Sequence, residues 1–338
     1  MARRAALSAT YEAPPNIALV KYWGVRDPER ALPYNSSLSV SLERLRSRTT
    51  VRFDAALAHD QVTLNGAPAT QGPRDGVVRF LDRIREMSGL DLAAEVRSHN
   101  NFPTASGLAS SASGFAALAG AATAAAGLKI APRALSQLAR FGSGSAARSV
   151  FGGFVEWRAG ARSDGRDCYA RPIYGPRHWP SLVDLVLLVE GAPVKGVRSA
   201  DAMQQTVRTS PLYAARLREL PARLGKIRRA IGSRDATRLF PLVMEECDSF
   251  REVCETTRPS LDYLTATSRA ILGEVRALNR EAGRPIAAYT HDAGAHVHVF
   301  TLGRYLPNVR GRLRRLPGVE RTLTLRPGPG GRLVRSGA

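Results

Sequence analysis

The segment from residue 105 to residue 127 constrains the fold most strongly, because most of its side chains are Ala, Gly or Ser. Small side chains let backbone amides approach an anion closely, and the start of the following helix adds free N–H groups and a positive dipole end. Pro103 interrupts the strand-like run before it, and Gly127 stops the helix. Hydroxyl donors come from Ser106, Ser110, Ser111 and Ser113. The segment predicts a phosphate cradle; the alternative is a close-packed core helix with a small-residue face.

The order of the expected elements indicates an α+β fold with two lobes, because strands followed by helices occur twice. The expected strands are 10–13, 48–53, 61–64, 92–98, 151–157, 182–189, 287–290 and 297–302, and the expected helices are 77–87, 105–127, 131–141, 211–233, 234–252 and 260–281. Asn65-Gly66 predicts a hairpin turn. We expect an N-terminal lobe with the cradle over residues 1–180, a C-terminal lobe over residues 181–325, and a disordered tail over residues 326–338, where Pro, Gly and Arg accumulate.

The formal net charge of +20 requires either an anionic partner or a compositional explanation. Only four of the 49 basic residues are Lys, and the Arg residues are spread along the chain instead of forming one patch with interleaved aromatics. We therefore interpret the charge mainly as a solvated surface, which disfavours a nucleic-acid partner. No apolar run reaches the roughly 18 residues of a membrane span. The three cysteines lack metal-ligand spacing, so we expect reduced thiols in a cytoplasmic protein.

The order of the residues in the cradle is more specific than their composition. Pro103-Thr-Ala-Ser-Gly-Leu-Ala-Ser-Ser-Ala112 resembles the nucleotide-phosphate loop of the GHMP kinase superfamily and, within it, that of the mevalonate diphosphate decarboxylases. Other stretches resemble the same family in the same order, namely Asn16-Ile-Ala-Leu-Val-Lys-Tyr-Trp-Gly24, 32–39, 142–149 with 152–157, 209–212 and Tyr289-Thr-His-Asp-Ala-Gly294. The resemblance covers roughly residues 10 to 305. It implies the GHMP kinase fold, with an N-terminal lobe like ribosomal protein S5, a ferredoxin-like C-terminal lobe, and an active site in the cleft between them.

The resemblance also implies a reaction. The family uses ATP and Mg²⁺ to phosphorylate the tertiary C3 hydroxyl of 5-diphosphomevalonate, and loss of phosphate and CO₂ then gives isopentenyl diphosphate. Such chemistry needs a base at the hydroxyl, cations for the phosphates and a clamp for the carboxylate. The resemblance makes Asp292 the base, Lys21 its partner and Arg148 the clamp, since a guanidinium binds a carboxylate through two parallel hydrogen bonds.

The remaining site residues follow from the same resemblance. The residues implied to bind the substrate are Tyr22, Trp23, Gly24, Val25, Arg74, Ser143, Gly144, Ser145, Ala146, Ala147, Arg148 and Ser199. The residues implied to bind ATP are Pro103, Ser106, Gly107, Leu108, Ala109, Ser110, Ser111 and Ser113. Mg²⁺ is expected to arrive with ATP, with Ser111 as a candidate protein ligand. We further expect a homodimer that acts on a small phosphorylated mevalonate and has no membrane partner.

The sequence departs from the family at Val25, where the usual pattern has a lysine that helps to hold the substrate's diphosphate. Arg26 compensates only if its side chain turns inward. A 5-phosphomevalonate decarboxylase that gives isopentenyl phosphate, or a mevalonate-type 3-kinase that stops before CO₂ loss, therefore stays an alternative. A basic RNA-binding protein is an alternative of another class. Asp292, Lys21 and Arg148 together favour the full reaction over the kinase alone.

The sequence also departs around the base, where His291, His296 and His298 occupy positions that the family usually fills otherwise. Three histidines within eight residues suggest a metal site. No carboxylate spacing supports one, so we expect Mg²⁺ with ATP instead.

Overall fold

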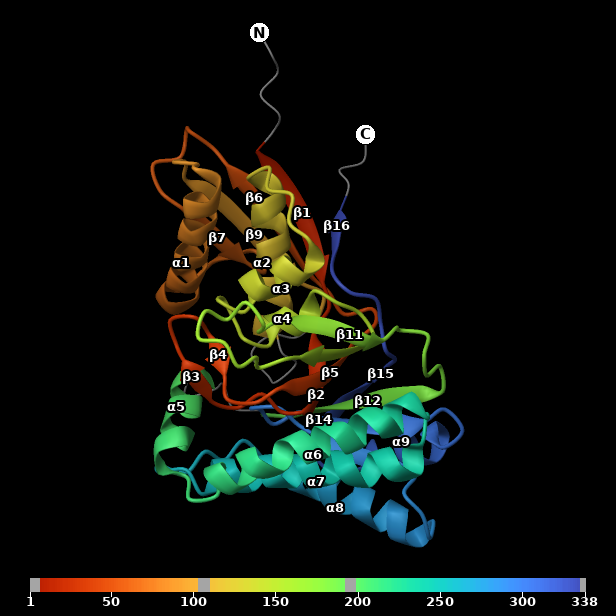
Figure 1. The fold of residues 1–338 in the computed structure, drawn as a ribbon. Coiled ribbons are helices and arrows are strands. Elements are labelled where there is room, and N and C mark those ends of the chain that lie inside the picture. Colours follow the sequence, from red (N-terminus) through yellow and green to blue (C-terminus); the bar gives the residue numbers. More distant parts are fainter. Residues whose placement is uncertain (1–6, 103–109, 192–198, 335–338) are drawn as a thin grey trace.

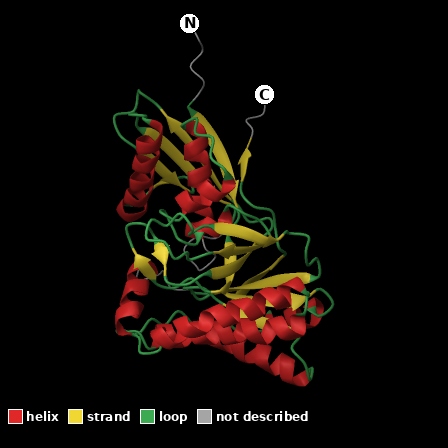
Figure 2. Cartoon of the chain, viewed as in Figure 1, coloured by secondary structure: helices red, strands yellow, loops and turns green. Residues whose placement is uncertain are grey.

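The computed structural model describes residues 7–102, 110–191 and 199–334 of the chain. In the view of Figure 1, one sheet with its helices forms the upper part, further sheets lie near the middle, and long helices cover the lower face. Figure 2 shows the same layers coloured by secondary structure. The predicted α+β class is confirmed, and each expected strand and helix overlaps one that the structure contains.

The upper sheet of the described residues has six strands. Their order is β16 (Arg332–Val334), β1 (Ser8–Ala13), β6 (Ser47–Phe53), β9 (Ala94–Asn100), β7 (Gln61–Leu64) and β8 (Ala67–Pro68). α1 (Gln71–Ser88) and α2 (Ser110–Ala125) share a hydrophobic cluster with this sheet, and α2 lies against β1 and β6. α2 is buried along most of its length, because its small side chains permit a close approach to the strands. The alternative of a close-packed core helix is therefore correct for the body of α2.

Two four-stranded sheets follow. The middle sheet contains β11 (Ala170–Tyr174), β10 (Phe154–Trp157), β5 (Ser37–Ser41) and β2 (Asn16–Val20), and the lower sheet contains β13 (Ala287–Thr290), β14 (Val297–Leu302), β12 (Leu182–Val189) and β15 (Val319–Leu325). A short ribbon pairs β3 (Val25–Asp27) with β4 (Leu32–Pro33). β12 is buried on both faces, as its mostly apolar sequence predicts, and alternate apolar residues join different hydrophobic clusters.

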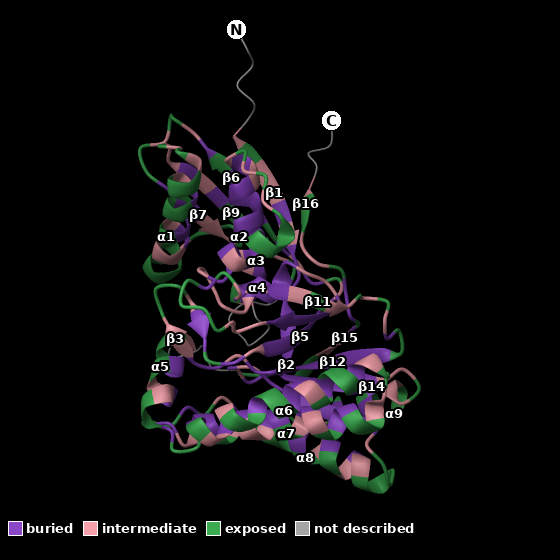
Figure 3. Ribbon diagram, in the orientation of Figure 1, coloured by how far each residue is buried: buried purple, intermediate pink, exposed green. Residues whose placement is uncertain are grey.

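The other described helices are α3 (Pro132–Ala139), α4 (Ala146–Ser149), α5 (Ser199–Thr209), α6 (Tyr213–Gly232), α7 (Ala236–Glu255), α8 (Ala266–Glu281) and α9 (Leu306–Leu313). Figure 3 shows stripes of buried and exposed residues along α6, α7 and α8, the pattern of helices that cover a core on one side. One cluster joins Ile17 of β2, Val186 of β12 and Phe240 of α7. The lobe boundary at residue 180 stays a prediction, because this cluster spans it. Within the described ranges, no helix combines the length and apolarity needed to cross a bilayer.

The tail is the clearest error of the sequence analysis. Residues 326–334 are ordered: β16 pairs antiparallel with β1, and Pro327 bridges to Leu42. The glycines, which suggested fraying, instead allow close backbone contact. A Cβ on Gly330 would lie 2.7 Å from the Gly152 nitrogen. The Gly153 N–H donates to the Gly328 carbonyl at 2.9 Å, which fixes the tail across the middle sheet.

Candidate active site

A cleft of about 1330 Å³ lies between the upper part of the molecule and the lower sheet with its helices. Its walls are the segment after β2, one side of α1, the first turn of α2, the loop 142–145, the start of α5 and the turn after β13. These segments are far apart in the sequence, so the fold alone brings their side chains together.

Lys21 and Asp292 form an ion pair in this cleft. Lys21 Nζ donates to Asp292 Oδ1 at 2.8 Å and to the Ala18 carbonyl at 2.8 Å. The Lys21 side chain is 3% exposed, whereas that of Asp292 is 26% exposed and lines the cleft. Burial raises the pKa of the Asp292 carboxyl, but the Lys21 ammonium and its hydrogen bond more than offset this, so the pKa lies below its ordinary value. Asp292 is therefore ionised at neutral pH and open to a ligand.

Glu246 of α7 holds the backbone of Lys21, and the sequence analysis missed it. Its Oε1 accepts the Lys21 N–H at 2.9 Å, and its side chain is fully buried. Arg216 and Arg223 of α6 donate to the same carboxylate, with Nη1 to Oε2 distances of 3.2 and 2.9 Å. This network fixes the β2–β3 segment to the helices below it. The only sequence signal was an acidic residue among the apolar positions of a helix.

Arg148 is buried without an anionic partner among the described residues. Its Nε donates to Asn16 Oδ1 at 3.1 Å and to Ser39 Oγ at 3.0 Å, and its Nη1 donates to Ser37 Oγ at 2.6 Å. Burial lowers the pKa of the Arg148 guanidinium to about 10, so the group stays cationic at neutral pH. It lines the cleft, and a buried charge held only by neutral oxygens suits an anionic ligand.

Tyr22 and Trp23 line the cleft wall. The Tyr22 ring packs edge-on against Trp157 at 4.8 Å, and Trp23 Nε1 donates to Thr206 Oγ1 at 3.0 Å. Gly24 does not line the cleft; it permits a backbone conformation and a close contact that a side chain would prevent. Its φ is 99°, and a Cβ there would lie 1.8 Å from the Tyr213 hydroxyl oxygen.

The loop before α4 divides into a cleft wall and a core. Ser143, Gly144 and Ser145 line the cleft, with Ser143 Oγ 3.2 Å from Ser145 Oγ. Ala146 and Ala147 are fully buried and do not line it. Their small side chains seat the first turn of α4, which carries Arg148. They support the site without forming its surface.

The side chains considered for binding the substrate's phosphates do not all line the cleft. Val25 lines the cleft, but Arg26 turns away and donates to the carbonyls of Pro33, Gly160 and Arg162. Arg74 lies on the exposed side of α1 and does not line the cleft. The assignment of Arg74 to the substrate rested on a two-residue match and stays a prediction.

Other arginines line the cleft instead. Arg79 and Arg83 lie on the cleft side of α1, four residues apart, and Arg140 follows α3. The Arg83 guanidinium lies 4.0 Å from the centre of the Phe141 ring, and that of Arg140 lies 4.9 Å from it. Helical spacing alone could have identified the first two.

The structure describes only part of the predicted phosphate cradle. Pro103, Ser106, Gly107, Leu108 and Ala109 lie outside the described residues. Ser110 and Ser111, at the start of α2, line the cleft, as does Ser199 at the start of α5. Ser113 is fully buried instead, and its Oγ lies 2.7 Å from Ser47 Oγ. Its side chain therefore faces the core, and its assignment to ATP stays a prediction.

The three histidines do not converge. His291 Nδ1 lies 2.8 Å from the Asp292 carbonyl oxygen, His296 Nδ1 accepts the Val189 N–H at 3.1 Å, and His298 Nδ1 lies 2.7 Å from Asp184 Oδ2. In the described ranges, no three His, Cys, Asp or Glu side chains come together as metal ligands.

Known proteins match almost the whole chain. Residues 13–170 match the family model described as the diphosphomevalonate decarboxylase-like N-terminal domain, and residues 185–324 match the mevalonate 5-diphosphate decarboxylase C-terminal domain. The chain belongs to the diphosphomevalonate decarboxylase family. Among curated relatives, the diphosphomevalonate decarboxylase of Homo sapiens is 41% identical and that of Bos taurus 42% identical. Each alignment covers 87% of this chain, with 77% of the human protein and 76% of the bovine one.

Solved structures of the family have the same fold. The mevalonate diphosphate decarboxylase from Enterococcus faecalis gives a TM-score of 0.90 at 36% identity, covering 98% of this chain and 100% of that chain. A structure in complex with MVAPP, AMPPCP and magnesium gives 0.91 at 36% identity with the same coverage. The family resemblance and the fold that it implied are thereby confirmed.

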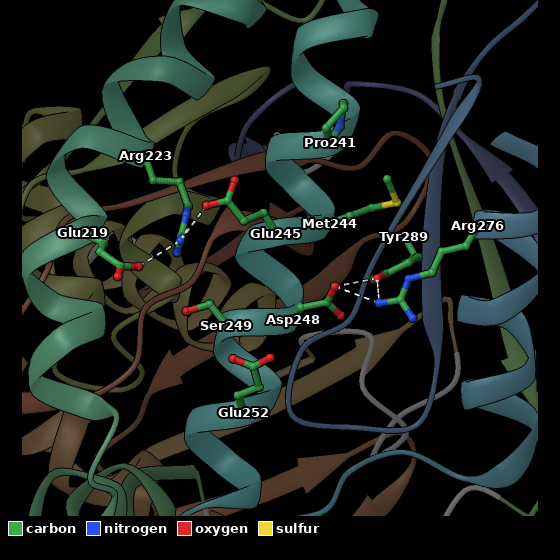
Figure 4. Close-up of a pocket in the computed structure, with 10 residues that line it drawn as sticks. All are labelled: Glu219, Arg223, Pro241, Met244, Glu245, Asp248, Ser249, Glu252, Arg276 and Tyr289. Carbon is green, nitrogen blue, oxygen red and sulfur yellow. Dashed lines mark hydrogen bonds and ion pairs between the residues drawn. The ribbon is translucent and has the colours of Figure 1, made fainter. Parts of the chain in front are cut away.

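A second hollow of about 490 Å³ lies outside this decarboxylase cleft, on the outer side of the helices. Figure 4 shows that ion pairs occupy it: Arg223 bridges Glu219 and Glu245, and Arg276 meets Asp248 and Tyr289. Both arginines of the hollow are thus paired with carboxylates, in contrast to Arg148 in the cleft.

Proposed function

We propose that this chain catalyses the ATP-dependent decarboxylation of 5-diphosphomevalonate to isopentenyl diphosphate. The supporting observation is that a held carboxylate and a buried guanidinium without an anionic partner share one cleft. Asp292, paired with Lys21, offers a base, and Arg148 offers a cationic clamp. Phosphoryl transfer to the substrate needs the base, and decarboxylation of the same molecule also needs the clamp.

The reaction begins at the tertiary C3 hydroxyl. Asp292 accepts its proton while the oxygen attacks the γ-phosphorus of ATP, and ADP leaves. Lys21 keeps the carboxylate ionised and oriented, since Nζ holds one carboxylate oxygen and leaves the other free. The C3 oxygen thereby becomes part of a phosphate, which is a good leaving group.

In the second half of the reaction, the carboxylate of the substrate must be held in position. When phosphate leaves C3, positive charge develops there, and the electron pair of the C1–C2 bond forms the new double bond as CO₂ departs. Arg148 binds the carboxylate before this step, and the hydroxyls of Ser37 and Ser39 fix the guanidinium. The clamp orients the reacting bond; it is not consumed.

The described part of the cradle fits a nucleotide. The first turn of α2 presents Ser110 and Ser111 to the cleft, with backbone N–H groups that have no earlier helical turn to bond. Magnesium, when bound with ATP, neutralises charge on the phosphates. Ser111 is the residue that would contact it.

A second candidate substrate is 5-phosphomevalonate. It is favoured by Val25 on the cleft wall and by Arg26, which is bonded elsewhere. We favour the diphosphate because Arg79 and Arg83 add cationic groups to the same cleft. The homodimer and the cytoplasmic location stay proposals; sedimentation of the full chain tests the first.

Turnover of mevalonate, 5-phosphomevalonate and 5-diphosphomevalonate with magnesium-ATP tests the proposal, with CO₂ release as the readout. Asp292→Asn should lower turnover at least about a hundredfold, because the amide keeps the shape and loses the basicity. ATP should still bind. Near-normal CO₂ release by the variant would remove Asp292 from the mechanism, and RNA retention without any release would favour the RNA-binding alternative.

A further inference from the structure

A buried histidine–aspartate pair lies near the Lys21–Asp292 pair, and the proposed reaction does not use it. His298 Nδ1 and Asp184 Oδ2 are 2.7 Å apart, with side chains 2% and 1% exposed. Asp184 Oδ1 and His298 Nε2 have no hydrogen-bond partner among the described residues. Selection for stability alone explains this pair poorly, because packed apolar residues often stabilise a core equally well and leave no buried polar atom unpaired.

The strand register places the pair relative to Asp292. The lower sheet runs β13, β14, β12, and His298 on β14 is directly opposite Thr290, the last residue of β13. Asp292 follows Thr290 by two positions. Asp184 lies on β12, one strand further away, and opposite Phe300, which is itself opposite Ala288. Both across and along the sheet, the imidazole is the end of the pair nearer to Asp292.

The imidazole also faces the side that holds Lys21. Directly opposite residues of an antiparallel pair share a face, so the Thr290 and His298 side chains project together. Thr290 Oγ1 donates to the Ala18 carbonyl at 3.5 Å, the carbonyl that accepts from Lys21 Nζ. The pair therefore lies on the face that supports the ionised Asp292.

We propose that the His298–Asp184 pair holds a proton at neutral pH as an imidazolium–carboxylate, and that its imidazolium end stabilises the ionised carboxylate of Asp292 while anionic substrates fill the cleft. This role rests on the proposed function of Asp292 as the base. His298 is a positioning residue that acts through Asp292 and touches no substrate. An N–O distance of 2.7 Å fits a charge-assisted hydrogen bond.

Lys21 and Arg148 also act on the Asp292 carboxylate. Burial lowers the pKa of His296, at the entry to β14, to about 4, so this ring is neutral at neutral pH. Asp184 bonds His298, and Glu246 holds the backbone of Lys21. Burial raises the pKa of Asp292, Lys21 gives the largest opposing effect, and His298 and Arg148 add to the lowering. Because the substrates bring negative charge into the cleft and push this pKa up, the contribution of His298 matters most in the loaded enzyme.

The charge state is tested first by NMR on the full chain with ¹⁵N-labelled histidine. At pH 7.5 both ring nitrogens of His298 should carry a proton, and Asp184→Asn should remove one of them. A ring with a single proton in the wild type would overturn the proposal. This measurement does not depend on any catalytic activity.

The effect on Asp292 is tested by the pH dependence of kcat for CO₂ release. In the double variant Asp184→Val/His298→Val, which removes the pair without leaving a lone charge, the acidic limb should move up by about half a pH unit. The plateau at higher pH should change less than about twofold. Thr301→Val is the control, because it removes a neutral hydrogen bond of the same strand and should leave the limb in place.

An unmoved limb in a folded double variant would overturn the proposal and leave the pair structural. If the double variant does not fold, Asp184→Asn replaces it in the same measurement. If Asp292→Asn keeps its turnover, the proposed function fails instead. The ¹³C titration of the Asp292 carboxyl in wild type and variant then still reports whether the pair acts on it.

Discussion

At the scale of single residues, Arg148 is deeply buried, and its side-chain partners among the described residues are all neutral. A lysine there would supply one compact ammonium where the proposed clamp needs a planar fork. Arg148→Lys should lose a charge-assisted hydrogen bond to the substrate, roughly 1.5–3 kcal/mol, so kcat should fall by about ten- to a hundredfold. Steady-state kinetics of CO₂ release check this, with ATP affinity expected to change little. Unchanged kinetics would show that Arg148 does not hold the carboxylate.

Val25 allows a test of substrate choice. It lines the cleft, and Arg26 is bonded to backbone carbonyls, so a new lysine at residue 25 would add a cation to this part of the cleft wall. Val25→Lys should lower KM for 5-diphosphomevalonate by up to about tenfold and do little for 5-phosphomevalonate. The ratio of the two kcat/KM values, in wild type and variant, reports this. A constant ratio would mean that residue 25 does not face the terminal phosphate.

The sequence predicted which residues line the cleft only where a motif was long. Lys21, Asp292 and Arg148 meet in one cleft as the motifs implied. Arg74 and Ser113 do not reach it, because one turn of a helix decides whether a side chain faces the cleft, the core or the solvent. Glu246 was not predicted, since its partner is the backbone N–H of a residue 225 positions away.

At the scale of elements, Glu246 joins α7, α6 and the segment after β2. Its removal would leave Arg216 buried without a carboxylate partner among the described residues. Glu246→Gln should lower the free energy of unfolding by about 3–5 kcal/mol. Urea unfolding measures this. The matched control is Glu245→Gln, because Glu245 is 59% exposed and its partner Arg223 keeps Glu246 and Glu219, so the loss should stay below about 1 kcal/mol.

Equal stability of these two variants would show that the buried network does not secure α6 and α7. The helices themselves were predictable from spacing, and so were the strands with strong alternation. Short elements such as β3, β4 and α9 were not, because two to eight residues carry too little periodicity.

At the scale of the whole molecule, the last described strand completes the first sheet. A chain that ends at Arg326 should lose β16 and the contacts of Gly328 and Gly330, and its Tm should fall by about 5 °C or more. A chain that ends at Val334 is the control and should melt like the full chain. Calorimetry distinguishes them, and equal melting of both would mean that the tail does not stabilise the fold.

The same strand has a consequence for biosynthesis. The edge of β1 pairs with residues 332–334, and Arg332 meets Glu12 across 320 positions of sequence. On the ribosome the upper sheet therefore stays one strand short until the chain has been made past residue 334. During that interval an open strand edge is exposed to neighbouring nascent chains, which makes a chaperone most useful before residues 332–334 have paired with β1.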